Sequence, residues 1–483
     1  MSVRERLSGL FVGQDELELT SGPIGKPLFF LSLPIVITNL LQVTYNLADT
    51  FWLGQYSTVA LAAITFGFPL VFLLISLGLG LSVAGSVLVA QYTGADETDE
   101  AEYAASQTMI FALLLSVVLG LAGFFLIEDF LALIGASGAV LPPATDYMEV
   151  ISLGLPFMFG FIVFIALMRG SGDTITPMLV MLGTVILNVA LDPFLIFGLG
   201  PFPQLGVQGA AIATIFSRGL AMVVGIAIMI RGRRGIQINV RDMFPDLAYA
   251  RRLLRIGIPA SIEGTGRAIS VNLLLVIVAL FPTTVEAAFG VGIRVFSTIF
   301  MPAIAVDRGV ETMTGQNIGA DKPDRAATAN RFAAKASFAI LTALGVVTFV
   351  AAPAIMGLFS DNPAVIAEGA NFLRIVAPTF GFMGVTRAYS GGFRGAGKVL
   401  TAAAITVVML GLIRLPIAWF GSMALGPGGV WASFAISNVL AAVVAYVWFS
   451  QGGWREVDLT DEESGDESEE ESDLGTPTAA TDD

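Results

Sequence analysis

Two aspartates stand out because they lie inside long apolar stretches, where an ionisable side chain is costly unless it faces protein, water or an ion. Asp49 occurs in YNLADTFW and Asp192 in LNVALDP. Asn188 lies one helical turn before Asp192, and Thr214 falls at a similar depth in the next apolar stretch. Two nearby carboxylates repel in a low dielectric, and a bound proton or Na⁺ relieves that repulsion. The pattern predicts a site for Na⁺ or H⁺ formed by these four side chains.

Pro193 and the aromatic residues near Asp49 extend this candidate site. Pro193 has no backbone N–H, so a helix that bends there leaves the carbonyl of Val189 without its usual donor and free to bind a cation. The residues around Asp49 are predicted to line a cleft for flat organic cations. They are Tyr45, Asn46, Phe51 and Trp52.

The second half of the chain carries a different set of charges in its apolar stretches. Glu263 and Arg267 are four residues apart, and Arg294 and Arg414 follow in later stretches. Two roles fit these residues: a buried structural ion-pair network, or a second coupling or substrate site.

Composition excludes much other chemistry. The 483 residues include no Cys and no His, which removes disulfides, thiolate nucleophiles, Cys/His metal sites and imidazole acid–base catalysis, so we do not expect an enzyme or a bound cofactor. Hydrophobic residues make up 55% of the chain and charged residues 13%, with a mean hydropathy of +0.80. The surroundings of most of the chain are therefore lipid, and no nucleic-acid partner is expected.

The apolar stretches are long enough to cross a bilayer as helices, since unpaired backbone groups cannot face lipid. We predict an all-α integral membrane fold with twelve transmembrane helices. They lie near 27–53, 59–89, 105–127, 147–168, 177–199, 207–230, 253–281, 287–308, 332–357, 365–390, 399–421 and 428–450. Connections after odd-numbered spans lack Lys and Arg, whereas most even-numbered ones carry them. The positive-inside rule then places both termini in the cytoplasm of a multi-pass protein of the cell membrane.

An internal repeat relates the two halves. The offset that places Pro34 on Pro259, which we call the repeat offset, also aligns AQYTGADETDEA at 90–101 with GQNIGADKPDRA at 315–326. A slightly smaller offset places Pro193 on Pro416. Six spans separate equivalent positions, so the halves are predicted to be parallel repeats that form two six-helix bundles around a cleft.

The repeat and the charge pattern divide the chain into five parts. Residues 456–483 hold 13 of the 39 acidic residues and no base, which predicts a disordered tail and leaves the membrane body nearly neutral. Residues 13–26 are largely polar, so no cleavable signal is expected. The expected parts are a cytoplasmic segment at 1–26, an N-lobe at 27–230, an Arg-rich cytoplasmic linker at 231–252, a C-lobe at 253–450 and an acidic cytoplasmic tail at 451–483.

These residues resemble the multidrug and toxic compound extrusion (MATE) transporters, particularly the DinF-like archaeal and bacterial branch. The resemblance rests on YNLAD, the Gln-x-x-Gly-Ala segments at 91 and 316, RGSGDTITP at 169–177, LNVALDP and GVQGAAIAT at 206–214. It implies alternating access and drug extrusion driven by a Na⁺ or H⁺ gradient. It also implies that Asp49, Asn188, Asp192 and Thr214 form the N-lobe cation site, and that the first span bends at Pro34.

The functional hypothesis is a monomeric antiporter that exports small, often cationic, drug-like molecules across the bilayer against Na⁺ or H⁺. A lipid-linked precursor flippase of the same architecture is one alternative and requires a cationic cleft, for which Arg267, Arg294 and Arg414 are the candidates. A non-transporting membrane receptor is the other alternative. An internal repeat with an ion site in only one of its two halves disfavours it.

Overall fold

The computed structural model describes residues 18–455, apart from the side chains of Phe68, Pro69 and Leu77. This part contains helices and no strand, so the predicted all-α fold is confirmed. The expected acidic tail lies almost wholly outside the described residues. The first half forms α2 (Gly25–Tyr56), α3 (Thr58–Gly94), α4 (Thr98–Leu133), α5 (Leu141–Leu153), α6 (Leu155–Gly170), α7 (Ile175–Phe197) and α8 (Val207–Arg231).

The second half follows a connection that contains the short 3₁₀ helix η2 (Val240–Met243). Its elements are α9 (Leu247–Val278), α10 (Thr283–Gly319), α11 (Pro323–Gly357), α12 (Pro363–Val376), η3 (Ala377–Thr379), α13 (Phe380–Gly395), α14 (Val399–Val407), η4 (Val408–Arg414), α15 (Leu415–Leu425) and α16 (Pro427–Ser450). Here η3 is a 3₁₀ turn and η4 is a π-helical segment within the eleventh predicted span.

The structure differs from the expected twelve continuous spans at two places, where a predicted span is interrupted. Ten described helices are long and apolar enough to cross a membrane, and α5 with α6 makes an eleventh span bent by 54°. The bend falls at Gly154 and is followed by Pro156, which lacks an N–H and cannot continue the ladder of α5. The predicted span 365–390 is divided into α12 and α13 by η3, which contains Pro378, so it does not form one long helix. Proline therefore interrupts the fourth span of each half.

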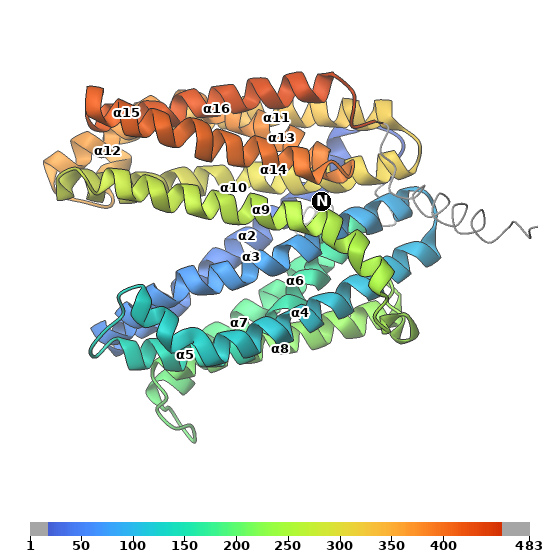
Figure 1. Ribbon diagram of the computed structural model, residues 1–483, viewed down its shortest axis with the longest axis horizontal. Helices are drawn as coiled ribbons and strands as arrows, with labels where there is room; N and C mark the ends of the chain where they lie inside the picture. The colour runs from blue at the N-terminus through green and yellow to red at the C-terminus, as the bar shows by residue number, and fades with distance from the viewer. Residues whose placement is uncertain (1–17, 456–483) are drawn as a thin grey trace, which may run out of the picture.

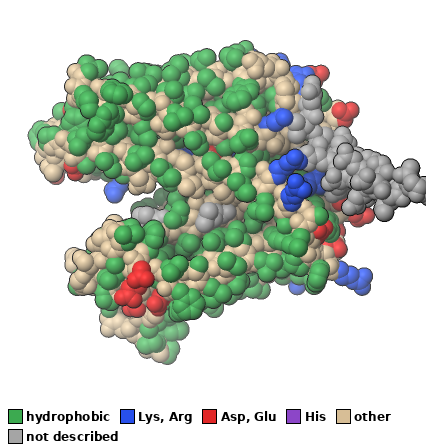
Figure 2. Space-filling view, viewed as in Figure 1, with side chains coloured by type: hydrophobic (Ala, Val, Ile, Leu, Met, Phe, Trp, Pro, Cys, Tyr) green, Lys and Arg blue, Asp and Glu red, His purple; other side chains and the backbone are tan. Residues whose placement is uncertain are grey.

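The helices form two groups that diverge toward one end of the molecule. Figure 1 shows α2 to α8 in one group and α9 to α16 in the other, with α5, α12 and α15 at the diverging end. Figure 2 shows an open cleft between the groups at that end, while most of the visible Lys and Arg side chains gather at the opposite end. At the closed end α3 packs against α9 and α10, and α10 also packs against α2.

Backbone geometry supports the repeat. Asp96 and Asp321 are the two described non-glycine residues with positive φ, at 62° and 54°, and the repeat offset places one on the other. Each follows a helix that ends at a glycine, Gly94 or Gly319, and these glycines are related by the same offset. A left-handed conformation is uncommon for a residue with a Cβ, although Asp adopts it more readily than most. The same turn therefore recurs at the same place in both halves.

Candidate cation site and buried charge network

The four residues of the predicted cation site converge between three helices of the first half. Asp49 lies near the end of α2, Asn188 and Asp192 lie one turn apart on α7, and Thr214 lies on α8. The helices meet because α7 packs against both α2 and α8. All four side chains are buried, and Asn188 and Asp192 are 0% exposed. The structure thus brings together the residues that sequence position alone suggested.

The site is only partly satisfied by its own hydrogen bonds. Asn188 Nδ2 donates to Asp192 Oδ1 at 3.3 Å, and Thr214 Oγ1 donates to Asp49 Oδ2 at 3.4 Å. Asp49 Oδ1, Asp192 Oδ2 and Asn188 Oδ1 are buried and have no hydrogen-bond partner among the described residues. Buried oxygens without donors are costly. The chemistry that satisfies them is a proton on a carboxylate or a small hard cation between the oxygens.

Pro193 lies inside α7 without ending the helix. Its missing N–H leaves the carbonyl of Val189 without its helical donor, one turn below the carboxylate of Asp192. Pro34 likewise lies inside α2, and Thr38 Oγ1 donates to the Pro34 carbonyl at 2.9 Å. Bends at Pro34 and Pro193 remain predictions.

Arg218 is a charged neighbour of the site that the sequence reasoning missed. It is buried, and its guanidinium lies over the ring of Tyr45, 4.6 Å from the centroid. Nη2 donates to Gln42 Oε1 at 2.7 Å, and the positive charge attracts Asp49. One signal was present in the sequence: Arg218 follows Thr214 by four residues and so shares its helix face. Two carboxylates and one guanidinium leave one negative charge for a cation to neutralise.

The predicted cleft residues divide between core and surface. Tyr45 is 2% exposed and packs in a hydrophobic core beneath Arg218, because it lies one turn before Asp49 on the inward face of α2. Asn46 and Phe51 are exposed, and Trp52 packs edge-on against Phe51. A role in lining a cleft therefore remains a prediction for Asn46, Phe51 and Trp52, whereas Tyr45 lies in the core next to the site.

The second half contains a buried ion-pair network centred on Arg394. Arg394 Nη1 lies 3.0 Å from Glu263 Oε2, Nε lies 2.9 Å from Glu311 Oε2, and Nη2 contacts Asp307. All four side chains are at most 8% exposed. Because the Arg394 guanidinium on α13 binds three carboxylates on two other helices, it fixes α9, α10 and α13 against one another.

Four further arginines surround these carboxylates or lie nearby. Arg267 Nη2 lies 3.1 Å from Glu263 Oε1, Arg308 Nη1 lies 2.8 Å from Glu311 Oε2, and Arg387 Nη1 lies 3.4 Å from Asp307 Oδ2. Arg169 of the first half reaches Glu311 at 3.9 Å. The network is thus joined to both halves of the chain.

Of the four predicted charges in the second half, only Glu263 and Arg267 form an ion pair with each other. Arg294 is exposed and forms no ion pair within the described part of the chain. Arg414 is half-buried, and its Nε donates to Ser437 Oγ and its Nη2 to Asn438 Oδ1, both at 2.8 Å. Arg394 was expected in a connection after the tenth span, and this was wrong: α13 continues to Gly395, which carries Arg394 inside the protein.

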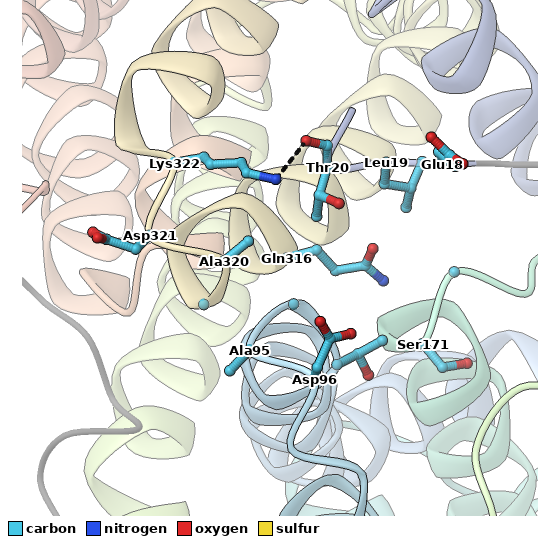
Figure 3. Close-up of a pocket in the computed structure, with 14 residues that line it drawn as sticks. Glu18, Leu19, Thr20, Ala95, Asp96, Ser171, Gln316, Ala320, Asp321 and Lys322 are labelled. Carbon is cyan, nitrogen blue, oxygen red and sulfur yellow. Dashed lines mark hydrogen bonds between the residues drawn. The ribbon is translucent and has the colours of Figure 1, made fainter. Parts of the chain in front are cut away.

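The closed end is held by reciprocal contacts between the halves. Gln91 Nε2 donates to the Gly395 carbonyl at 2.9 Å, and Gln316 Nε2 donates to the Gly170 carbonyl at 3.1 Å. Figure 3 shows Gln316 close to Ala95, Asp96 and Ser171, beside a pocket of about 510 Å³. We call the four residues Gln91, Gly170, Gln316 and Gly395 the glutamine clasp.

Comparisons with known proteins agree with this arrangement. The sequence matches the family model described as MatE over residues 34–194 and 259–420, two segments that begin at Pro34 and Pro259. The chain is 30% identical to the FAD transporter of Shewanella oneidensis, over 90% of this chain and 96% of that protein. It is 28% identical to the probable multidrug resistance protein YpnP of Bacillus subtilis, over 92% and 98% of the two chains.

The fold also matches solved structures. A crystal structure of a MATE transporter in the bent conformation superposes with a TM-score of 0.84 at 26% identity, covering 91% of this chain and 97% of that one. The family consists of transporters and not enzymes, as the composition of the sequence predicted. From its two family segments, its relatives and its fold, the chain belongs to the MATE family of multi-pass membrane transporters in the MOP superfamily.

Proposed function

We propose that this protein is a secondary active exporter that antiports small organic molecules against Na⁺ or H⁺ by alternating access. The observation that carries the proposal is the pair of buried carboxylates, Asp49 and Asp192, with oxygens that lack donors. A cation is the ligand that such a pair prefers, and cation binding can shift a conformational equilibrium in proportion to its different affinity for the two states. Relatives named as multidrug resistance proteins and an FAD transporter support small-molecule cargo.

The proposed orientation places both termini in the cytoplasm. Lys and Arg gather at the end where the glutamine clasp closes the two halves, as the positive-inside rule requires of a cytoplasmic end. The cleft then faces outward, toward the side from which the coupling cation enters. We further propose a monomer of the cell membrane, placed in the DinF-like branch, with the lobes, linker and tail divided as the sequence predicts.

A lipid-linked precursor flippase is the second candidate. The observation that favours it is a cavity in the second half lined by Arg267, Arg387 and Arg414, because a pyrophosphate linkage requires cationic partners. Arg294, which the sequence reasoning added to that set, does not line the cavity.

The test is efflux from proteoliposomes with Na⁺ and H⁺ gradients imposed separately, using ethidium or norfloxacin as cargo. Wild type is compared with Asp49→Asn and Asp192→Asn, and Asp146→Asn, which removes an exposed carboxylate of α5, is the matched control. We expect one gradient to drive efflux, either site substitution to abolish it, and the control to transport normally. Normal coupled efflux by both site variants would overturn the proposed site.

A further inference from the structure

A second cavity, of about 430 Å³, lies within the second half of the chain. Its walls come from α9, α10, α13, α14, η4 and α16. Three arginines line it, namely Arg267, Arg387 and Arg414, and its described lining residues include neither Asp nor Glu. The cavity therefore presents positive charge, although three carboxylates lie behind its wall.

The cavity occupies the position in the second half that corresponds to the cation site in the first. The repeat offset places Asp49 on Leu274 and Gln42 on Arg267, and the smaller offset that relates Pro193 to Pro416 places Thr214 on Ser437. Leu274, Arg267 and Ser437 all line the cavity. Pro193 directly follows Asp192, whereas Pro416 lies two positions after Arg414. Both carboxylates are thus replaced by leucines, Leu274 and Leu415. The arginines stand at neighbouring positions, Arg267 in place of Gln42 and Arg414 directly before Leu415.

Arg414 is the least neutralised charge in the cavity. Its described hydrogen-bond partners, Ser437 and Asn438, are neutral, and its guanidinium lies 4.3 Å from the centroid of the Phe434 ring. Arg267 is close enough to repel it. Arg414 is half-buried and Arg267 is 30% exposed. Even a partly buried guanidinium without a carboxylate is costly, and repulsion between two of them adds to that cost. An anion bound between them would relieve both costs.

The charges around the cavity also favour an anionic ligand. Four arginines of the second half, Arg267, Arg308, Arg387 and Arg394, pair with three buried carboxylates, Glu263, Asp307 and Glu311. Arg414 adds a fifth positive charge that has no carboxylate partner among the described residues. The network cannot neutralise itself. The segment that carries Arg414 is the π-helical η4, and π-helical turns often occur at functional sites.

The rest of the lining is apolar and aromatic. It includes Phe289, Phe296, Phe300, Met301 and Met409. Phe296 stacks on Phe300, and Arg387 lies 5.0 Å from the Phe300 ring centroid. A ligand for this cavity therefore needs an anionic group for the arginines and a flat or apolar body for the rings.

We propose that this cavity binds a small organic anion with an aromatic or apolar body, held by Arg267 and Arg414. Export of the bound anion rests on the proposed function, whereas its binding does not. An anionic amphiphile can be a soluble molecule or a lipid with an acidic headgroup, and the experiment separates the two.

The test is equilibrium binding to the full chain in nanodiscs of zwitterionic lipid, measured by fluorescence anisotropy without an ion gradient. Carboxyfluorescein and rhodamine 123 are the probes, because they share a xanthene ring system but carry opposite charges. We expect carboxyfluorescein to bind, and Arg267→Gln or Arg414→Gln to weaken its binding at least about tenfold, since each removes a charge-assisted contact. Arg414→Lys keeps the charge and should restore much of the affinity.

Arg294→Gln is the matched control, because Arg294 lies on α10 outside the cavity and should leave carboxyfluorescein affinity unchanged. Equal binding of carboxyfluorescein by wild type and both Gln variants, at equal melting temperatures, would overturn the proposal. Competition by added phosphatidylglycerol would support the anion cavity and identify the ligand as lipid. Absence of competition would support it with a soluble ligand.

The antiport proposal and the anion-cavity proposal can be refuted independently. Asp49→Asn should abolish coupled transport and leave carboxyfluorescein binding intact. If Asp49→Asn transports normally while Arg414→Gln loses the dye, the antiport proposal is wrong and the cavity assignment stands.

Discussion

Gln91 and Gln316, which the internal repeat places on one another, make the same contact in opposite directions across the two halves. Each donates from Nε2 to a backbone carbonyl at the end of a helix in the other half, Gly395 and Gly170 respectively. These two glycines are related by the same repeat offset. The clasp is thus a two-fold arrangement generated by the repeat, and both of its acceptors are main-chain groups that need a close approach of the helices.

The close approach depends on Gly94 and Gly319. A Cβ at Gly94 would lie 2.0 Å from the Gln316 carbonyl oxygen, which belongs to a backbone and cannot rotate away. Overpacking of this kind costs about 1–3 kcal/mol, so Gly94→Ala should shift the protein toward an open clasp. Maleimide labelling of Ser171→Cys, buried beside the clasp, should become roughly tenfold faster, which corresponds to about 1.4 kcal/mol.

Gly183→Ala is the control for the clasp, because a Cβ at Gly183 meets nothing within 4 Å. It should leave the labelling rate of Ser171→Cys unchanged. If Gly94→Ala labels no faster than Gly183→Ala, the clasp does not close the two halves.

Arg394 should be among the residues on which stability depends most. Arg394→Gln removes the buried guanidinium that contacts Glu263, Asp307 and Glu311 together. Breaking a buried ion pair from one side costs about 3–5 kcal/mol. The melting temperature in nanodiscs should fall markedly. Arg294→Gln, at an exposed arginine of the same half, should shift stability by no more than about 0.5 kcal/mol. Similar melting curves for the two variants would show that the network does not hold α9, α10 and α13 together.

Asp246 should make the start of α9 sensitive to acid. Its side chain caps α9 by accepting from the Ala248 N–H at 2.8 Å, and the hydrogen bond from the Tyr103 hydroxyl lowers the pKa of Asp246. A lowered pKa means that the stabilisation is complete above about pH 4 and is lost as the pH falls through the lowered value. Hydrogen-exchange protection of the first turns of α9 measures this loss.

Two substitutions separate the cap from its charge. Asp246→Ala should remove about 0.5–2 kcal/mol of local stability at neutral pH, because it removes the N-cap acceptor. Asp246→Asn keeps that acceptor, so it should retain most of the protection and lose its acid dependence. Acid-dependent protection in Asp246→Asn equal to that in wild type would assign the effect to another group.

Arg218 should set how strongly the first-half site attracts a cation. Its positive charge competes with the ion for the negative charge of Asp49, so Arg218→Gln should tighten cation binding roughly tenfold, if folding is preserved. A Na⁺ titration followed by tryptophan fluorescence, at two pH values, measures the change. Weaker Na⁺ binding by a folded Arg218→Gln protein would contradict this charge balance.

Much of the first-half site could be predicted because it depends on local signals. Asp49 and Asp192 interrupt apolar stretches, and helical spacing places Asn188 and Asp192 on one face. The same helical spacing places Arg218 one turn after Thr214. Arg218 was nevertheless not predicted as part of the site. The all-helical fold followed from hydropathy, since the bilayer allows few alternatives.

The second-half network could not be predicted in the same way. The predicted tenth span ends at residue 390, yet α13 continues through Arg394 to Gly395. The predicted eighth span ends at residue 308, whereas α10 runs on to Gly319 and carries Glu311 into the interior. The partners of Arg394 include Glu311 and Glu263, which are 83 and 131 positions away in the chain, and no local pattern specifies such contacts.

A cation at Asp49 and Asp192 is proposed to control which end of the protein is open. Because the chain has no native Cys, spin labels can be attached at Ser137→Cys and Asp361→Cys alone, in the α4–α5 and α11–α12 connections at the cleft end. Distances between the labels are then measured by double electron–electron resonance in nanodiscs, with and without Na⁺, at neutral and acidic pH. We predict that Na⁺ or acid shifts the wild type toward shorter distances, and that Asp49→Asn/Asp192→Asn does not respond. A double variant that responds like wild type would contradict the account.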